Sequence, residues 1–281
     1  MRTLVLCGML ILATTVSLRA AQPDPKDLVQ AKLLADVSQI KPGEPFTVGV
    51  LLKIKPKWHV YWKNPGDAGA PTRVQFKLPN GFSVGELNFP IPISFEQPGD
   101  VAGYGYEDEV MLTATVTPPN KLEQGRPLRL QASASWLVCE EVCIMGGEEL
   151  SLELPVAQEA APANAELFEK WNQRMPQRQQ RMTVQPYNGQ RDEPIVVSIE
   201  LDQPASDVQW FVGSADHFSV EEMQVESDGN RSTFRFIPTP PIRGTVALPM
   251  LVAYTDAQGT RRGVEQEIQI GQVRTGSARQ P

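Results

Sequence analysis

Two cysteines separated by three residues are the part of this chain best suited to chemistry. Cys139 and Cys143 end a segment of alternating polarity, and the third cysteine, Cys7, lies in a segment that we expect to be removed. Thiols this close can join in a disulfide, and a partner's thiolate can open such a bond by exchange. The pair therefore indicates either a structural cross-link or a redox switch.

The spacing of the pair constrains the backbone between the two cysteines. Four residues of one extended strand span about 13 Å, whereas the Cα atoms of a disulfide lie about 4.4–6.8 Å apart. The chain must therefore turn at residues 140–142, the length of a three-residue hairpin loop. Strand parity points Val138 inward and Cys139 outward, so we expect the sulfur of Cys139 at the rim, as the exchanging sulfur.

The energetics favour a switch over a cross-link. Closing a five-residue ring stabilises the fold by roughly 2 kcal/mol, against about 4.7 kcal/mol for a hundred-residue ring. Glu140 and Glu141 lie between the sulfurs, and like charge raises a thiol pKa. We therefore expect a disulfide that is opened by a partner's thiolate, with a passive hairpin disulfide as the alternative.

The elements that must position the pair are β-strands. Residues 46–54, 128–138 and 150–156 alternate between apolar and polar side chains, and turn signals such as Asn80-Gly81 separate the segments. Alternation of this kind is typical of antiparallel strands with one wet face, and many short strands indicate a β-sandwich. The fold class that we predict is all-β.

The second half of the chain predicts a helix and a second sandwich. Asn164 could cap a short helix, ended by Pro176, whose apolar stripe packs against a neighbouring domain. That stripe consists of Leu167, Phe168, Trp171 and Met175. Five segments result: a signal peptide at 1–20, a redox sandwich at 28–157, a linker with a short helix at 158–183, a second sandwich at 190–271 and a polar tail at 272–281.

The N-terminus predicts export. Arg2, an apolar run over residues 4–16 and Ala20 have the order of a secretory signal peptide, and disulfides persist outside the cytosol. No later stretch approaches the roughly 20 apolar residues of a membrane span. The chain without its leader has 24 basic and 33 acidic residues, and the lack of a basic cluster argues against nucleic acid as a partner.

Three motifs in order resemble a known family. They are WHVYWKNPGD at 58–67, YGYEDEVML at 104–112 and WLVCEEVCI at 136–144. Together they resemble the periplasmic N-terminal domain of the thiol:disulfide interchange protein DsbD, in particular its ScsB-type branch, over about residues 30–156. The resemblance implies immunoglobulin-like sandwiches in the periplasm and no cofactor. It also implies electron transfer from a membrane-embedded transporter, here supplied by another chain, to periplasmic thioredoxin-like oxidoreductases.

The same resemblance implies roles for individual residues. Cys139 and Cys143 match the family's redox pair, and the segment 95–104 matches a loop that shields it with an aromatic side chain. Phe95 or Tyr104 is then the shield. Trp58 and Tyr61 match aromatic residues that line the family's site, although ordinary core packing is an alternative for both of them.

Two other functions stay open at this point. Cys139, Cys143 and Met145 are soft ligands suited to Cu(I), and His59 could join them; the chain's other histidine is His217. Such a site would suit copper tolerance, whereas the family also links the fold to cytochrome c biogenesis. The cysteine-free second sandwich favours a third possibility, a non-redox structural or adhesion module.

Overall fold

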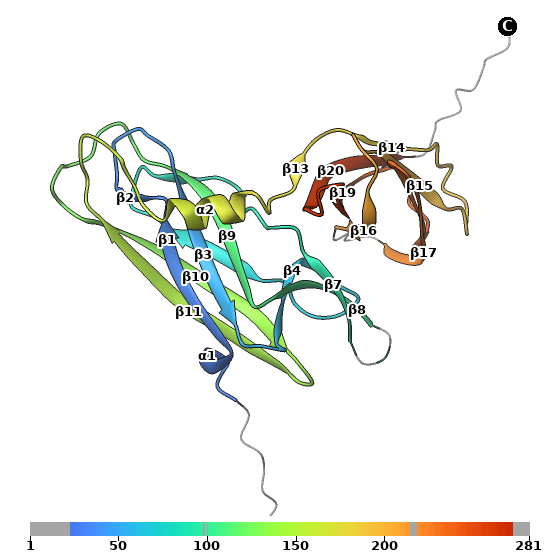
Figure 1. Cartoon of the computed structure of the whole chain (residues 1–281), viewed down its shortest axis with the longest axis horizontal. Coiled ribbons are helices and arrows are strands. Elements are labelled where there is room, and N and C mark those ends of the chain that lie inside the picture. The colour runs from blue at the N-terminus through green and yellow to red at the C-terminus, as the bar shows by residue number, and fades with distance from the viewer. Residues whose placement is uncertain (1–22, 98, 100, 214–217, 272–281) are drawn as a thin grey trace, which may run out of the picture.

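The computed structural model describes residues 23–97, 99, 101–213 and 218–271, and these residues form two β-sandwiches (Figure 1). The prediction of an all-β fold with two sandwiches and a short connecting helix is confirmed. None of the helices in these ranges has both the length and the apolar character that crossing a bilayer requires. The expected signal peptide and polar tail lie outside the described residues.

The first sandwich begins with a short helix and a four-stranded antiparallel sheet. Helix α1 spans Pro25–Leu28. The sheet has the order β1-β3-β9-β6, with β1 at Val29–Ala35, β3 at Phe46–Ile54, β9 at Glu109–Thr117 and β6 at Ser83–Val84. Strand β3 has the bounds that its alternation predicts, and Val48, Val50 and Leu52 on its inner side are fully buried. This sheet closes the core from one side.

The opposite sheet carries the cysteines. Its main path has the order β11-β10-β4-β8-β7. Strand β5 pairs with another part of β10, on the same edge as β4. The bounds are β4 His59–Gly66, β5 Arg73–Lys77, β7 Ile93–Gln97, β8 Val101–Glu107, β10 Leu128–Cys139 and β11 Cys143–Leu154. Two short strands, β2 (Val37–Gln39) and β12 (Ala161–Pro162), pair separately. Val60, Tyr106 and Val138 line the inner face of this sheet at the hairpin end.

The second sandwich has two four-stranded sheets and its own core. One sheet has the order β13-β20-β19-β16 and the other β14-β15-β18-β17. The bounds are β13 Gln177–Arg178, β14 Met182–Val184, β15 Ile195–Glu200, β16 Ser206–Val212, β17 Ser219–Asp228, β18 Arg231–Thr239, β19 Thr245–Thr255 and β20 Arg261–Gly271. Its core contains the stacked rings of Trp210 and Phe234.

Helix α2 connects the sandwiches and packs on the first one. It spans Ala165–Asn172, and Trp171 enters the core of the first sandwich. Asn164 stands at the predicted cap position, but its side chain donates to the carbonyl of Ala35 on β1 and does not cap the helix. The helix also ends at Asn172, before the expected stop at Pro176.

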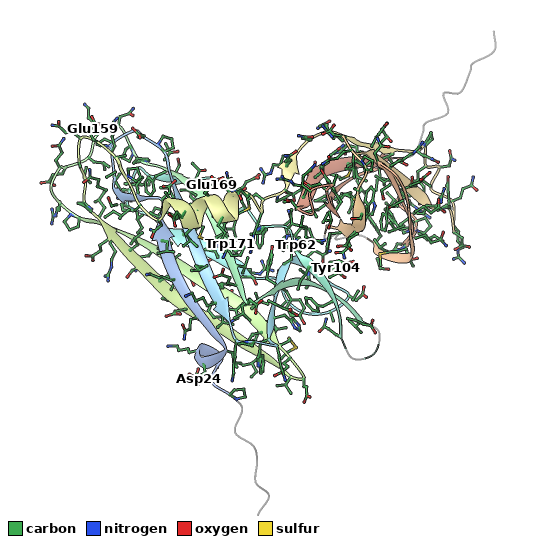
Figure 2. The ribbon with its side chains drawn as sticks, in the orientation of Figure 1. Asp24, Trp62, Tyr104, Glu159, Glu169 and Trp171 are labelled. Carbon is green, nitrogen blue, oxygen red and sulfur yellow. A yellow bond between two sulfur atoms is a disulfide. The ribbon has the colours of Figure 1, made fainter. Side chains whose placement is uncertain are left out.

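The two sandwiches share an apolar contact. Phe211, Leu251 and Ala253 of the second sandwich belong to the buried cluster of the first. The ring of Phe211 lies 5.0 Å from that of Tyr104 and 5.9 Å from that of Trp62, centroid to centroid. Figure 2 shows Trp62 and Tyr104 on the side of the first sandwich that faces the second. The second sandwich thus closes one end of the first core.

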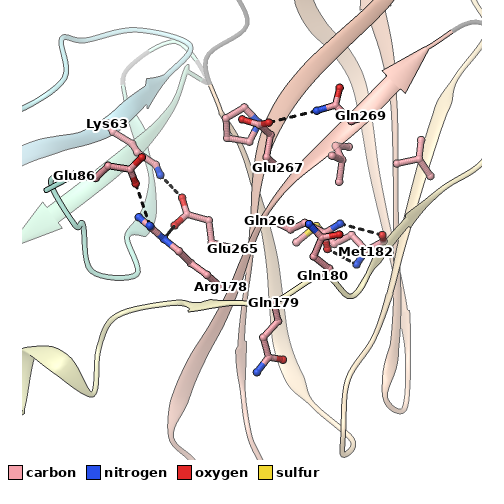
Figure 3. Close-up of a pocket in the computed structure, with 13 residues that line it drawn as sticks. Lys63, Glu86, Arg178, Gln179, Gln180, Met182, Glu265, Gln266, Glu267 and Gln269 are labelled. Carbon is pink, nitrogen blue, oxygen red and sulfur yellow. Dashed lines mark hydrogen bonds and ion pairs between the residues drawn. The ribbon is translucent and has the colours of Figure 1, made fainter.

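Polar contacts surround this apolar junction. Lys63 forms an ion pair with Glu265, and Arg178 pairs with Glu86 at 3.0 Å (Figure 3). These side chains line a cavity of about 790 Å³ between the sandwiches. The amide of Asn64 also donates to the carbonyl of Val212. The pair of Arg178 and Glu86 is exposed, and exposed ion pairs contribute little net stability.

Candidate functional site

The cysteine hairpin has the geometry that its spacing predicts. Strands β10 and β11 are antiparallel neighbours with Cys139 directly opposite Cys143, and the two sulfurs are bonded. Residues 140–142 form the connection, in which the amide of Glu140 donates to the carbonyl of Val142. The Cα atoms of the two cysteines lie 4.2 Å apart. The predicted three-residue turn is therefore confirmed.

The two sulfurs differ sharply in exposure. Cys139 is only 1% exposed, whereas Cys143 is exposed to solvent. The prediction that Cys139 points outward to a partner is therefore wrong. Parity does place Cys139 on the face opposite Val138, but side chains from neighbouring strands cover that outer face at this end of the sheet. Cys143, on the edge strand β11, is the sulfur that a partner can reach.

A small polar cluster lies beside the buried sulfur. The hydroxyl of Tyr61 is 3.3 Å from Sγ of Cys139, 2.8 Å from Oε1 of Gln97 and 3.4 Å from Nε2 of His59. The hydroxyl has a single hydrogen, so it donates to one acceptor at a time. Tyr61 and Cys139 are buried, yet neither belongs to the hydrophobic core of either sandwich. The site is thus a buried cluster on the outer face of the sheet, separate from the core.

The ring of Phe95 lies over this cluster. Its centroid is 4.1 Å from the ring of His59 and 6.0 Å from that of Tyr61. Gly103 stands opposite Phe95 in the β7–β8 pair, and a Cβ on Gly103 would lie 2.2 Å from the Phe95 ring. A side chain at Gly103 would therefore displace the ring. Phe95 thus reaches His59 across the backbone of Gly103.

The other predicted site residues lie away from the sulfurs. Tyr104 points to the opposite face of β8 from Gly103 and packs on Phe211, so the expectation that it shields the disulfide is corrected. Trp58 belongs to the core of the first sandwich, in line with the alternative of ordinary core packing. Of the two aromatic residues expected to line the site, Tyr61 contacts Cys139 directly.

The ligands of the copper alternative share one face of the sheet. Cys139 pairs with His59 on one side and with Cys143 on the other, and Met145 follows two residues later on β11, 64% exposed. In the disulfide form neither sulfur is the thiolate that binds a metal. Within the described ranges, no group of three or more His, Cys, Asp or Glu residues is arranged to hold a metal ion. His217 lies outside those ranges.

Burial sets the protonation states in the cluster. It lowers the pKa of His59 below the ordinary value for imidazole, and it raises the pKa of Tyr61, which the hydrogen bond to Gln97 partly offsets. Near neutral pH both side chains are therefore uncharged. An uncharged cluster suits the disulfide form, because a buried, unpaired charge would be costly.

Two members of the cluster are not among the redox-site residues that the sequence predicts. Gln97 is not predicted at all, and His59 is expected only as a possible Cu(I) ligand. His59 precedes Tyr61 by two residues, so both must lie on the same face of one strand. The pairing of His59 with Cys139 depends on strand register, which the sequence alone does not show. Gln97 reaches Tyr61 from β7, 36 residues away. Only the order β10-β4-β8-β7 within one sheet brings these residues together.

Comparison with known proteins agrees with this geometry. Residues 26–155 match the family described as thiol:disulfide interchange protein DsbD, N-terminal, and no curated protein sequence matches the chain. The N-terminal periplasmic domain of ScsB from Proteus mirabilis has a similar fold, with a TM-score of 0.64 and 19% identity, over 90% of this chain and 97% of that one. The reduced DsbD N-terminal domain of Neisseria meningitidis aligns with 50% of this chain and 95% of its own, at 12% identity and a TM-score of 0.31. Residues 26–155 form a DsbD N-terminal-like domain.

Proposed function

We propose that this protein relays electrons by thiol–disulfide exchange at Cys139 and Cys143. The observation that carries the proposal is the unequal exposure of two bonded sulfurs, one open to solvent and one buried beside a hydroxyl donor. The family match over residues 26–155 supports the same chemistry. A purely structural cross-link of one tight hairpin would have no need of such a pocket.

The exchange begins at the exposed sulfur. A partner's thiolate attacks Sγ of Cys143, the Cys139–Cys143 bond breaks, and its electron pair leaves with Cys139. The new bond is a mixed disulfide between the partner and Cys143. The hydroxyl of Tyr61, 3.3 Å from the leaving sulfur, can hydrogen-bond to the thiolate. The partner's second thiol then displaces Cys143, which leaves a dithiol here and a disulfide on the partner.

The ring of Phe95 acts in this proposal as the shield of the pocket. It covers His59, which lies opposite Cys139 in the strand register, and Tyr61, whose hydroxyl contacts the sulfur. Gly99, between β7 and β8, has a positive φ of 94°, a conformation that glycine adopts without cost. Movement of this hairpin would open the pocket when a partner docks.

We propose the periplasm as the location and two kinds of partner. The similar ScsB domain is described as periplasmic, and residues 1–20 have the order of a signal peptide. A membrane-embedded thiol–disulfide transporter would supply the electrons. Periplasmic thioredoxin-like oxidoreductases would receive them.

An equilibrium titration of the chain without its leader tests the proposal. The protein is held in glutathione buffers of stepped potential, and free thiols and the far-ultraviolet circular dichroism are measured together. We expect a reversible two-electron transition with an unchanged spectrum, and transfer of the electrons to a thioredoxin-like protein in a coupled assay. A disulfide that resists reduction until the protein unfolds would support the structural cross-link and contradict the proposal.

A further inference from the structure

Four side chains form a row across four strands at the hairpin end of the sheet. Cys143 on β11 pairs with Cys139 on β10, Cys139 with His59 on β4, and His59 with Glu107 on β8. Directly opposite residues on one face have Cβ atoms about 4.5–5.5 Å apart. His59 therefore stands between a redox sulfur and a carboxylate, and Glu107 is exposed to solvent.

His59 also contacts the side chain of Tyr61 through its imidazole. It is 8% exposed, its ring meets that of Tyr61 edge-on at 84° with centroids 5.3 Å apart, and Phe95 covers its other side. Nε2 of His59 lies 3.4 Å from the hydroxyl of Tyr61, which lies 3.3 Å from Sγ of Cys139. The three atoms form a continuous path from imidazole to sulfur.

The proposed exchange places a negative charge at the sulfur end of this path. Opening the disulfide leaves a negative charge on Cys139, in a pocket where an unpaired charge is strongly disfavoured. Tyr61 can share its hydrogen but cannot easily lose it, because burial raises its pKa. An imidazole next to a new negative charge gains proton affinity. His59 is thus the group suited to supply a proton.

We propose that His59 is a positioning residue that acts through Tyr61, passing a proton to Cys139 when that sulfur leaves and taking it back when Cys139 attacks. This inference rests on the proposed exchange function. Among the residues that the structure describes, the titratable groups around His59 are Tyr61 on its own strand, Cys139 on β10 and Glu107 on β8. Phe95 and Gln97 of β7 are the other neighbours.

One proton and one electron pair move in each direction of the exchange. On reduction, the electron pair of the broken S–S bond goes to Cys139, and the new negative charge draws a proton from solvent onto neutral His59. Cys139 then takes the hydrogen of Tyr61 as the imidazolium returns one to the tyrosine oxygen, so that His59 ends neutral again. On oxidation, the Cys139 thiol gives its proton back along the same path, and its sulfur displaces the group bound to Cys143.

A two-stage reaction with 5,5′-dithiobis(2-nitrobenzoate) isolates the oxidation step. In the reduced protein the exposed Cys143 reacts first and releases one thionitrobenzoate, and Cys139 then displaces the second. We expect His59→Gln to slow the second release at least about tenfold near neutral pH and to remove its inflection with pH, with the first release unchanged. Tyr61→Phe should act in the same way. His217→Gln, at the chain's other histidine, is the control.

Equal second-phase rates and equal pH profiles for His59→Gln and the unchanged protein would overturn the inference. Nuclear magnetic resonance of the native sequence covers the case of a variant that fails to fold. The chain has two histidines, and His217→Gln assigns their signals. We expect the pKa of His59 to rise on reduction, and an unchanged pKa would also overturn the inference. Failure of the glutathione titration would instead count against the proposed function, since the two-stage assay needs no protein partner.

Discussion

The two sandwiches share an architecture but differ in where they bury polar groups. In the second sandwich a buried serine, Ser232, accepts from the indole of Trp210 at the edge of one continuous core. In the first, Tyr61 and Cys139 are buried outside the core, and the ring of Phe95 packs on Tyr61 and His59 beside them. A buried cluster separate from the core can open while the core stays closed. The first sandwich thus carries its reactive disulfide beside a buried polar cluster, whereas the buried polar group of the second is part of its core.

The largest expected effect separates the two cysteines. Cys143→Ser leaves only the buried Cys139, which reacts after a local opening that costs about 3 kcal/mol and slows modification roughly 100-fold. Cys139→Ser leaves the exposed Cys143, which should react at once and hold a mixed disulfide. Stopped-flow measurement with 5,5′-dithiobis(2-nitrobenzoate) gives both rates. Similar rates for the two variants would remove the asymmetry on which the proposed function depends.

The second prediction compares two buried phenylalanines of the second sandwich. Phe211→Ala and Phe234→Ala should each destabilise the protein by about 3 kcal/mol, the ordinary cost of deleting a buried ring. Only Phe211 contacts Trp62 and Tyr104 of the first sandwich. Hydrogen exchange followed by mass spectrometry should therefore show lost protection in β4 and β8 for Phe211→Ala alone. Equal loss in both variants would mean that the junction does not support the redox sheet.

A third, smaller effect is expected at the shield. Phe95→Ala should speed reduction of the disulfide by dithiothreitol roughly three- to tenfold, because the pocket opens more often. Ile93→Ala on the same strand, where the side chain is already 36% exposed, is the matched control. An unchanged rate in Phe95→Ala would show that the ring does not protect the sulfurs.

The smallest effect concerns pH. Because burial lowers the pKa of His59, the unfolded chain binds a proton there more readily than the folded one. The free energy of unfolding should therefore fall as the pH drops below about 6.5, the ordinary imidazole value. His59→Phe should lose this part of the pH dependence in urea titrations between pH 5 and 8. The same slope in both proteins would place the effect elsewhere.

The sequence predicts local features of this molecule well. Alternation over residues 46–54 and 128–138 locates two strands, and the distance limit of a disulfide predicts the turn at 140–142. Each of these signals depends on neighbours in the chain. The physical constraint is short-range, so it can be applied without knowing the fold.

The burial of Cys139 depends on distant segments and was therefore missed. Parity gives the face on which a side chain lies, but it does not show whether another hairpin covers that face. Here the covering residue, Phe95, lies 44 positions earlier and reaches the site because Gly103 leaves room for it. The position of Tyr104 against Phe211 likewise depends on the junction between the sandwiches.

Mapping the first mixed disulfide tests the account most directly. The oxidised protein is partly reduced with glutathione, quenched in acid, and digested, and the modified cysteine is identified by mass spectrometry. The account predicts glutathione on Cys143 and a free thiol at Cys139, with native circular dichroism throughout. Glutathione found mainly on Cys139 would contradict it.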